Sequence, residues 1–160
     1  MNTTLSSSSA KTSSPAAAGM PQIQPYLFFD GRCEEALEYY RTALGAKVTA
    51  LIRYKDSPEP PPPGCVPPGG ENKVMHSNFT VGSTQVMASD GRCGGKPTFE
   101  GFALSLAVAD SAEAERRFSA LADGGRVEMP LGKTFFSPCF GMVVDRFGVF
   151  WMVIVSQPMP

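Results

Sequence analysis

Histidine is nearly absent from this chain of 160 residues, which has only His76. The four cysteines, Cys33, Cys65, Cys93 and Cys139, are too far apart in the sequence to form a CxxC motif. A zinc finger built from Cys and His ligands is therefore excluded. Scattered single cysteines are typical of free thiols in a reducing compartment, so we expect a cytoplasmic protein without a disulfide framework.

A strong net charge is also absent, because 14 Lys and Arg residues against 15 Asp and Glu residues give −1. This balance provides no basic surface for nucleic acid or for an anionic membrane. The apolar runs are shorter than ten residues, whereas a membrane-spanning helix needs about 20 apolar residues. We therefore expect neither nucleic acid nor a membrane among the partners.

Residues 1–20 lack aromatic side chains and are rich in Ser, Thr and Ala. A segment of this composition cannot bury enough apolar surface to offset the entropy lost on ordering. It also lacks the apolar core of a secretory signal. We predict a disordered tail over residues 1–20 and a single domain over residues 21–157.

The most informative feature that is present is a pattern that occurs twice. Residues 25–45 read as a strand, a polar turn, an amphipathic helix and a glycine, and residues 103–125 repeat this order. Internal similarity of this kind indicates two copies of one structural unit. We predict two βαβββ modules, residues 22–90 and 100–155, joined by a glycine-rich linker over 91–99. The predicted fold class is α+β, an open eight-stranded, barrel-like cleft with its helices outside.

Hydrophobic periodicity gives the expected elements of each module. Helices are predicted over residues 33–44 and from Asp110 or Ser111 to residue 122. The predicted strands are 22–30, 47–54, 74–81, 84–90, 102–108, 126–131, 140–144 and 149–155. The proline-rich segment 56–72 cannot be a helix or a central strand. It is either an exposed polyproline-like loop or a flap over a binding cleft.

Polar residues of the first module are candidates for a functional site. His76 alternates with Asn78 and Thr80 along one predicted strand, so these side chains share a face. If that face lines the cleft, His76 could bind an anion or act as a general base. The alternative is a partly buried histidine that is satisfied by its neighbours. Asp90 either caps the turn before Gly91 or supplies a carboxylate at the rim of the cleft.

The order and spacing of these segments resemble the vicinal oxygen chelate superfamily, which includes glyoxalase I, bleomycin-resistance proteins and extradiol dioxygenases. Within it, the chain is most similar to the PhnB-like group. The segments that carry the resemblance are residues 25–31, 36–46, 74–77, 86–90, 134–136, 140–141 and 145–152. The resemblance implies paired βαβββ modules and a homodimer, because members of the superfamily commonly pair through their sheets.

Metal-dependent members of this superfamily bind a divalent cation through His, Gln or Glu side chains on four strands. The resemblance places the corresponding positions of this chain at Pro25, Met87 or Ala88, Phe102 or Ala103, and Met152. None of these residues is a ligand for such a cation, so we predict no metal and no cofactor. Because Met152 then faces the cleft, strand alternation puts Trp151 beneath a helix.

Three functions are consistent with the sequence. The first is a metal-free protein that binds a small apolar or aromatic molecule in the cleft. The ligand-binding residues predicted for it are His76, Asn78, Met87, Asp90, Phe102, Phe136, Phe140 and Met152. The second is a glyoxalase-like lyase or isomerase that uses His76 or metal ligands at other positions, and the third is a dimeric protein without a ligand. A doubly wound methyltransferase is not indicated, because no glycine-rich loop opens a helix after a first strand.

Overall fold

The computed structural model describes residues 19–91 and 93–157, so nearly all of the predicted tail over residues 1–20 lies outside the described residues. Within the described ranges, neither helix combines the length and the hydropathy that crossing a membrane would require.

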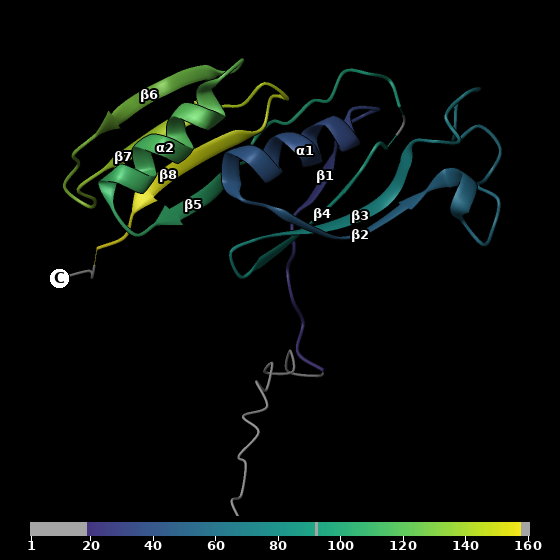
Figure 1. The fold of residues 1–160 in the computed structure, drawn as a ribbon, viewed down its shortest axis with the longest axis horizontal. Helices are drawn as coiled ribbons and strands as arrows, with labels where there is room; N and C mark the ends of the chain where they lie inside the picture. Colours follow the sequence, from purple (N-terminus) through teal and green to yellow (C-terminus); the bar gives the residue numbers. More distant parts are fainter. Residues whose placement is uncertain (1–18, 92, 158–160) are drawn as a thin grey trace, which may run out of the picture.

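The two modules have the same order of elements (Figure 1). The first contains β1 (Tyr26–Phe28), α1 (Cys33–Leu44), β2 (Lys47–Arg53), β3 (Val74–Val81) and β4 (Thr84–Ser89). The second contains β5 (Leu104–Val108), α2 (Ser111–Ala122), β6 (Arg126–Gly132), β7 (Phe140–Val144) and β8 (Phe150–Val155). The order of strands is β1-β4-β3-β2 in one sheet and β5-β8-β7-β6 in the other. The predicted α+β fold of two βαβββ modules is confirmed, with two separate four-stranded sheets that do not close into a barrel.

Local signals explain where the elements begin and end. β1 covers only three of the nine residues predicted as a strand, since β1 is an edge strand and Pro25 has no amide hydrogen to donate. Gly45 caps the C-terminus of α1, and its φ of 66° is left-handed and therefore suits glycine. Helix α2 begins at Asp110, whose carboxylate accepts a hydrogen bond from the Glu113 amide at 2.8 Å. Both helices have the predicted bounds.

A proline-rich loop joins β2 to β3 after the short 3-10 helix η1 (Tyr54–Asp56). Its two ends are held together, because the Tyr54 amide donates to the Lys73 carbonyl at 3.1 Å and the Lys55 amide to the Glu71 carbonyl at 2.9 Å. The loop extends past the ends of β2 and β3, away from the second module (Figure 1).

One hydrophobic core extends through both modules. At the junction, the Tyr40 ring of α1 lies 5.7 Å from the Trp151 ring of β8, and the Phe29 and Phe147 rings are 5.8 Å apart. The helices also touch each other, since the Tyr39 hydroxyl donates to the Ala120 carbonyl at 2.7 Å. Helices α1 and α2 therefore lie together at the junction and leave the opposite face of each sheet uncovered.

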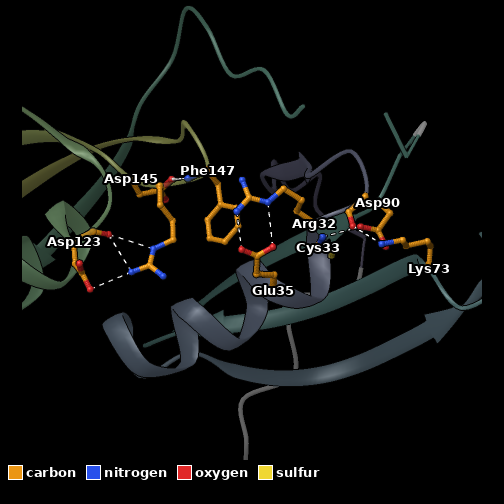
Figure 2. A network of polar contacts seen from close by, with 10 residues as sticks. Arg32, Cys33, Glu35, Lys73, Asp90, Asp123, Asp145 and Phe147 are labelled. Carbon is orange, nitrogen blue, oxygen red and sulfur yellow. Dashed lines mark hydrogen bonds and ion pairs between the residues drawn. The ribbon is translucent and has the colours of Figure 1, made fainter. Parts of the chain in front are cut away.

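Two arginines add reciprocal contacts across the junction. The Arg32 guanidinium lies 4.6 Å from the centre of the Phe147 ring, and the Arg146 guanidinium lies 4.3 Å from the centre of the Tyr39 ring. Figure 2 shows this stretch of polar and aromatic contacts along α1. Each arginine places its charge over a ring of the other module, where a cation–π contact contributes on the order of 1 kcal/mol.

Candidate functional site

The uncovered face of the first sheet carries a row of side chains from all four strands. Across the sheet, Ala50 of β2 pairs with Asn78 of β3, Asn78 with Met87 of β4, and Met87 with Tyr26 of β1. Paired residues point to the same side of a sheet, and successive residues point to opposite sides. Phe79, the neighbour of Asn78, is buried in the core, so the row faces away from α1. We call this surface the open face of the first sheet.

His76 lies on the open face next to Tyr26, and the Tyr26 hydroxyl is 3.1 Å from the imidazole Nδ1. Their ring centroids are 5.6 Å apart, and Phe28 packs against Tyr26 with centroids 4.8 Å apart. On the neighbouring strand β2, Ile52 is the direct partner of His76. When the Tyr26 hydroxyl donates to Nδ1, the imidazole proton is on Nε2, which then presents a hydrogen-bond donor to a ligand.

Asn78 adds an acceptor to this surface. Its side-chain Oδ1 is buried and has no hydrogen-bond partner within the described part of the chain. A buried acceptor without a donor costs about 1–3 kcal/mol, so such atoms in folded proteins call for a specific explanation. The open face thus combines one unsatisfied acceptor with the imidazole of His76, the ring of Tyr26 and the thioether of Met87.

Asp90 lies apart from this surface, because it is only 1% exposed. One carboxylate oxygen accepts the Cys33 amide at 2.7 Å and the other accepts the Val74 amide at 2.6 Å. Figure 2 shows the carboxylate directed at the start of α1. Asp90 therefore caps α1 and the start of β3, a role different from both the turn cap and the rim carboxylate that the sequence suggested.

The Cys33 thiol next to this cap is not a candidate nucleophile. Burial raises its pKa to about 12, even though a hydrogen bond to the Ser77 hydroxyl opposes the shift. A thiol with such a pKa is protonated at neutral pH, and only the thiolate is a strong nucleophile.

Most of the predicted site residues of the second module lie on or beside the other sheet. Phe136 packs against Phe140 of β7 with ring centroids 5.0 Å apart, and Met152 of β8 is half-buried on the uncovered face. Trp151 is buried on the helix side, as predicted. Phe102 precedes β5 and contacts Phe99. Six of the eight predicted residues thus form two separate groups: His76, Asn78 and Met87 on the first sheet, and Phe136, Phe140 and Met152 on or beside the second. Phe102 lies near the linker, and Asp90 lies in the core.

Sequence reasoning missed Tyr26 and a groove between the modules. The groove has a volume of about 460 Å³, runs between the β3–β4 turn and β5, and has no charged side chain in its lining. The signal that could have identified Tyr26 is the alternation of Tyr26 and Phe28 with the buried Leu27. The groove had no such signal, because it is made by segments 18 to 56 residues apart that only the topology brings together.

The four positions that the resemblance aligns with the superfamily's divalent-metal ligands carry no side chain that suits such an ion. Met87 and Met152 offer thioethers, and Pro25 and Ala103 offer no side-chain donor at all. Hard and borderline divalent cations are bound by oxygen, imidazole or thiolate ligands, and none of these positions offers one. Among residues 19–91 and 93–157, no three His, Cys, Asp or Glu side chains form a group that could hold a metal ion.

Comparison with known proteins places the whole described domain in one family. The family model described as 3-demethylubiquinone-9 3-methyltransferase matches residues 21–154. Protein YjdN of Escherichia coli (strain K12) is 35% identical over 145 residues, which cover 86% of this chain and 97% of that protein.

Solved structures agree with this relationship. Protein PA1353 from Pseudomonas aeruginosa is 45% identical with a TM-score of 0.73, and the match covers 87% of this chain and all of that one. The PhnB protein from Bacillus cereus is 28% identical with a TM-score of 0.70 and coverage of 85% and 100%. A glyoxylase/bleomycin resistance protein/dioxygenase domain from Frankia sp. EAN1pec, 13% identical with a TM-score of 0.60 and coverage of 88% and 98%, shares the fold.

Proposed function

The chain belongs to the PhnB-like family described as 3-demethylubiquinone-9 3-methyltransferase, which has the vicinal oxygen chelate fold. From this premise we propose that the protein binds a small molecule on the open face of its first sheet. The observation that carries the proposal is the unsatisfied Oδ1 of Asn78 beside His76. The ligand is an apolar or aromatic molecule with an N–H or O–H group that donates to Asn78 Oδ1 once the side chains that cover this atom move aside. The site works without the divalent metal of the metal-dependent relatives.

The surroundings of Asn78 support this class of ligand. The Tyr26 and Phe28 rings and the Ile52 side chain offer apolar surface, and Phe28 is 58% exposed. Ligand sites are commonly apolar surfaces with a few well-placed polar groups that fix orientation. His76 Nε2 and Asn78 Oδ1 then supply a donor and an acceptor on the same strand.

A substitution at Asn78 separates a binding role from a structural one. We expect Asn78→Leu to leave the melting temperature unchanged or raised, because it removes a buried unsatisfied acceptor at similar volume. The same change is expected to weaken ligand binding about tenfold, the effect of one lost hydrogen bond of about 1.4 kcal/mol. His76→Ala is expected to weaken binding to a similar extent, while Ser119→Ala on the exposed face of α2 leaves it unchanged.

The measurement is a thermal-shift screen with planar phenols and aromatic amides, followed by calorimetry on the compounds that stabilise the protein. Each compound is compared with its O-methyl or N-methyl derivative, which keeps the ring and removes the donor. We expect the methylated partners to bind about tenfold more weakly. The proposal is contradicted if a compound and its methylated derivative bind with equal affinity to wild type and to Asn78→Leu. It is also contradicted if no compound in the screen stabilises the protein.

An enzyme that uses His76 is the second candidate, because the contact with Tyr26 orients the imidazole. A general base needs a free nitrogen lone pair, and in the tautomer described above the Nδ1 lone pair already accepts from Tyr26. The arrangement therefore supports binding better than proton abstraction. Turnover of a bound compound that disappears in His76→Ala and persists in Asn78→Leu would favour the enzyme.

The family's description mentions methyl transfer, but the architecture gives no reason to assign that reaction to this chain. The common class of methyltransferases uses a doubly wound parallel sheet with a glycine-rich loop after its first strand. The described residues form two mixed four-stranded sheets, in which only the pairs β1–β4 and β5–β8 are parallel.

A second copy of the chain is the proposed partner for the uncovered sheet faces. Phe28, Ile52 and Phe136 are each at least 39% exposed, and a soluble monomer rarely leaves large apolar patches open. We expect sedimentation to give twice the 17.1 kDa chain mass. Phe28→Glu on the open face is expected to yield a monomer, whereas Arg116→Glu on the exposed side of α2 is not. A monomeric wild type would refute the dimer without affecting the calorimetric test of the ligand.

A further inference from the structure

Three methionines form a row on the uncovered face of the second sheet. Met129 of β6 is the direct strand partner of Met142 of β7, and Met142 is the partner of Met152 of β8. Met129 is 41% exposed, and the other two are half-buried. Val143 and Trp151, the neighbours in sequence of Met142 and Met152, are buried on the helix side. The three thioethers therefore share the face that points away from α2.

The spacing lets the three sulfur atoms approach a common point. Side chains of directly paired residues have Cβ atoms about 5 Å apart, and a methionine side chain has three rotatable bonds beyond the backbone. The sulfurs of Met129 and Met152 can therefore reach toward a point above Met142. The corresponding row of the first sheet, Tyr26 to Ala50, contains one methionine, Met87.

The neighbouring rows make this surface apolar. On one side Phe140 is the partner of Ile154, and on the other Val144 is the partner of Phe150. Thioethers are neutral, soft ligands that have no proton to lose on binding a metal. They select soft cations such as Cu(I), while Mg²⁺ and Ca²⁺ require oxygen ligands. We propose that the methionine row of Met129, Met142 and Met152 binds one soft monovalent metal cation, Cu(I) or its redox-stable analogue Ag(I).

This site is distinct from the proposed ligand site, because it lies on the other sheet and uses no residue of the open face of the first sheet. It shares only Met152 with the positions that correspond to the divalent-metal site of the superfamily, which takes one ligand from each of four strands in the two modules. The methionine row takes its three ligands from adjacent strands of one module.

The test uses the whole chain with Cys65 and Cys93 replaced by serine, because accessible thiols would compete for the ion and the other two cysteines are buried. The protein is labelled with ¹³C at the methionine methyl groups and titrated with Ag(I) in chloride-free buffer. We expect the resonances of Met129, Met142 and Met152 to shift together and saturate at one equivalent, while that of Met87 stays in place. Single Met→Leu variants assign the resonances and nearly preserve side-chain volume.

Met142→Leu is the decisive variant, since Met142 is the middle ligand. It is expected to abolish the one-equivalent transition, whereas Met87→Leu leaves it unchanged. For Cu(I), competition with bicinchoninate under ascorbate is expected to show at least tenfold weaker binding by Met142→Leu than by Met87→Leu. The proposal is overturned if all methionine resonances shift in parallel, if none shifts at one equivalent, or if Met142→Leu binds like Met87→Leu.

Discussion

Replacing Asp145 with alanine is expected to lower the free energy of unfolding by about 3–5 kcal/mol, because it leaves several buried hydrogen-bond donors without an acceptor, at about 1–3 kcal/mol for each group left unsatisfied. Asp145 is 3% exposed and lies between β7 and β8. One carboxylate oxygen accepts from the Tyr40 hydroxyl at 2.5 Å and the Trp151 indole at 2.9 Å. The other accepts from the backbone amides of Phe147 and Val149 at 2.9 and 3.1 Å. Alanine would leave four donors without this acceptor.

The effect is large because the network joins the two modules. Tyr40 is on α1 of the first module, and Asp145 and Trp151 belong to the second. Urea unfolding followed by the fluorescence of Trp151, the single tryptophan, measures the change directly, with circular dichroism as the second probe. The matched control is Asp123→Ala, since the Asp123 side chain pairs with Arg146 at the same junction but is 78% exposed. An exposed pair contributes about 0–1 kcal/mol. A loss at Asp145 no larger than the loss at Asp123 would contradict the prediction.

The same carboxylate gives the stability a pH dependence. Burial raises the pKa of Asp145 above its usual value of 3.8, although the hydrogen bonds from Tyr40, Trp151 and the two backbone amides oppose the shift. A carboxyl with a raised pKa in the folded state binds its proton more tightly there than in the unfolded chain. Its contribution to stability is therefore greatest below the unfolded pKa and declines as the pH rises from about 4 through the folded pKa.

Asp145→Asn removes this titration while it keeps the shape of the side chain. Measured from pH 4 to pH 7, the stability of wild type relative to Asp145→Asn is expected to fall as the pH rises. The exposed carboxylates are common to both proteins, so their titration cancels in the difference. A relative stability that instead rises through this window would show that the hydrogen bonds outweigh burial.

Asp90→Ala is expected to cost about 2–4 kcal/mol, because the substitution removes two buried, charge-assisted hydrogen bonds to the amides of Cys33 and Val74. The residue before α1, Arg32, supplies no side-chain cap of its own. Asp90 thus provides the cap from 57 residues away in the sequence. The expected result is a lower midpoint of urea unfolding together with greater exchange of the first amides of α1.

The control for Asp90 is Asp110→Ala at the start of α2. The Asp110 cap is local and exposed, so its removal is expected to cost about 1 kcal/mol. If Asp90 were instead a ligand-binding carboxylate at a cleft rim, Asp90→Ala would weaken ligand binding and leave the stability nearly unchanged. Equal small losses for the two variants would refute the capping role.

Much of the fold was predictable because its signals are local. The bounds of α1, α2, β3 and β7 agree with the predicted ranges, since apolar spacing along a short segment determines which face of a helix or strand can be buried. The prediction that Met152 and Trp151 point to opposite faces of their sheet is confirmed for the same reason. The largest error was at the edge strand β1, where pairing with a single neighbour leaves the strand short, while the bounds of β2, β4, β5, β6 and β8 differ from the predicted ranges by one or two residues.

The candidate site was only partly predictable. His76, Asn78 and Met87 do share a surface, because strand alternation and a tight hairpin together specify their register. Phe136, Phe140 and Met152 lie on the other sheet, and Asp90 is in the core. Alternation tells which side of a strand a residue faces, but it does not tell which sheet face remains uncovered.

By itself, the sequence determined the repeat, the two helices and the succession of strands, because each of these depends on residue identity or on neighbours within a few positions. The tertiary structure alone decided the contacts between distant residues. Tyr26 meets His76 because β4 pairs with both β1 and β3, and Asp145 meets Tyr40 because the two modules share one core. The free energy of such contacts depends on burial and on hydrogen-bond partners, and both are set only when segments 50 or 105 residues apart come together.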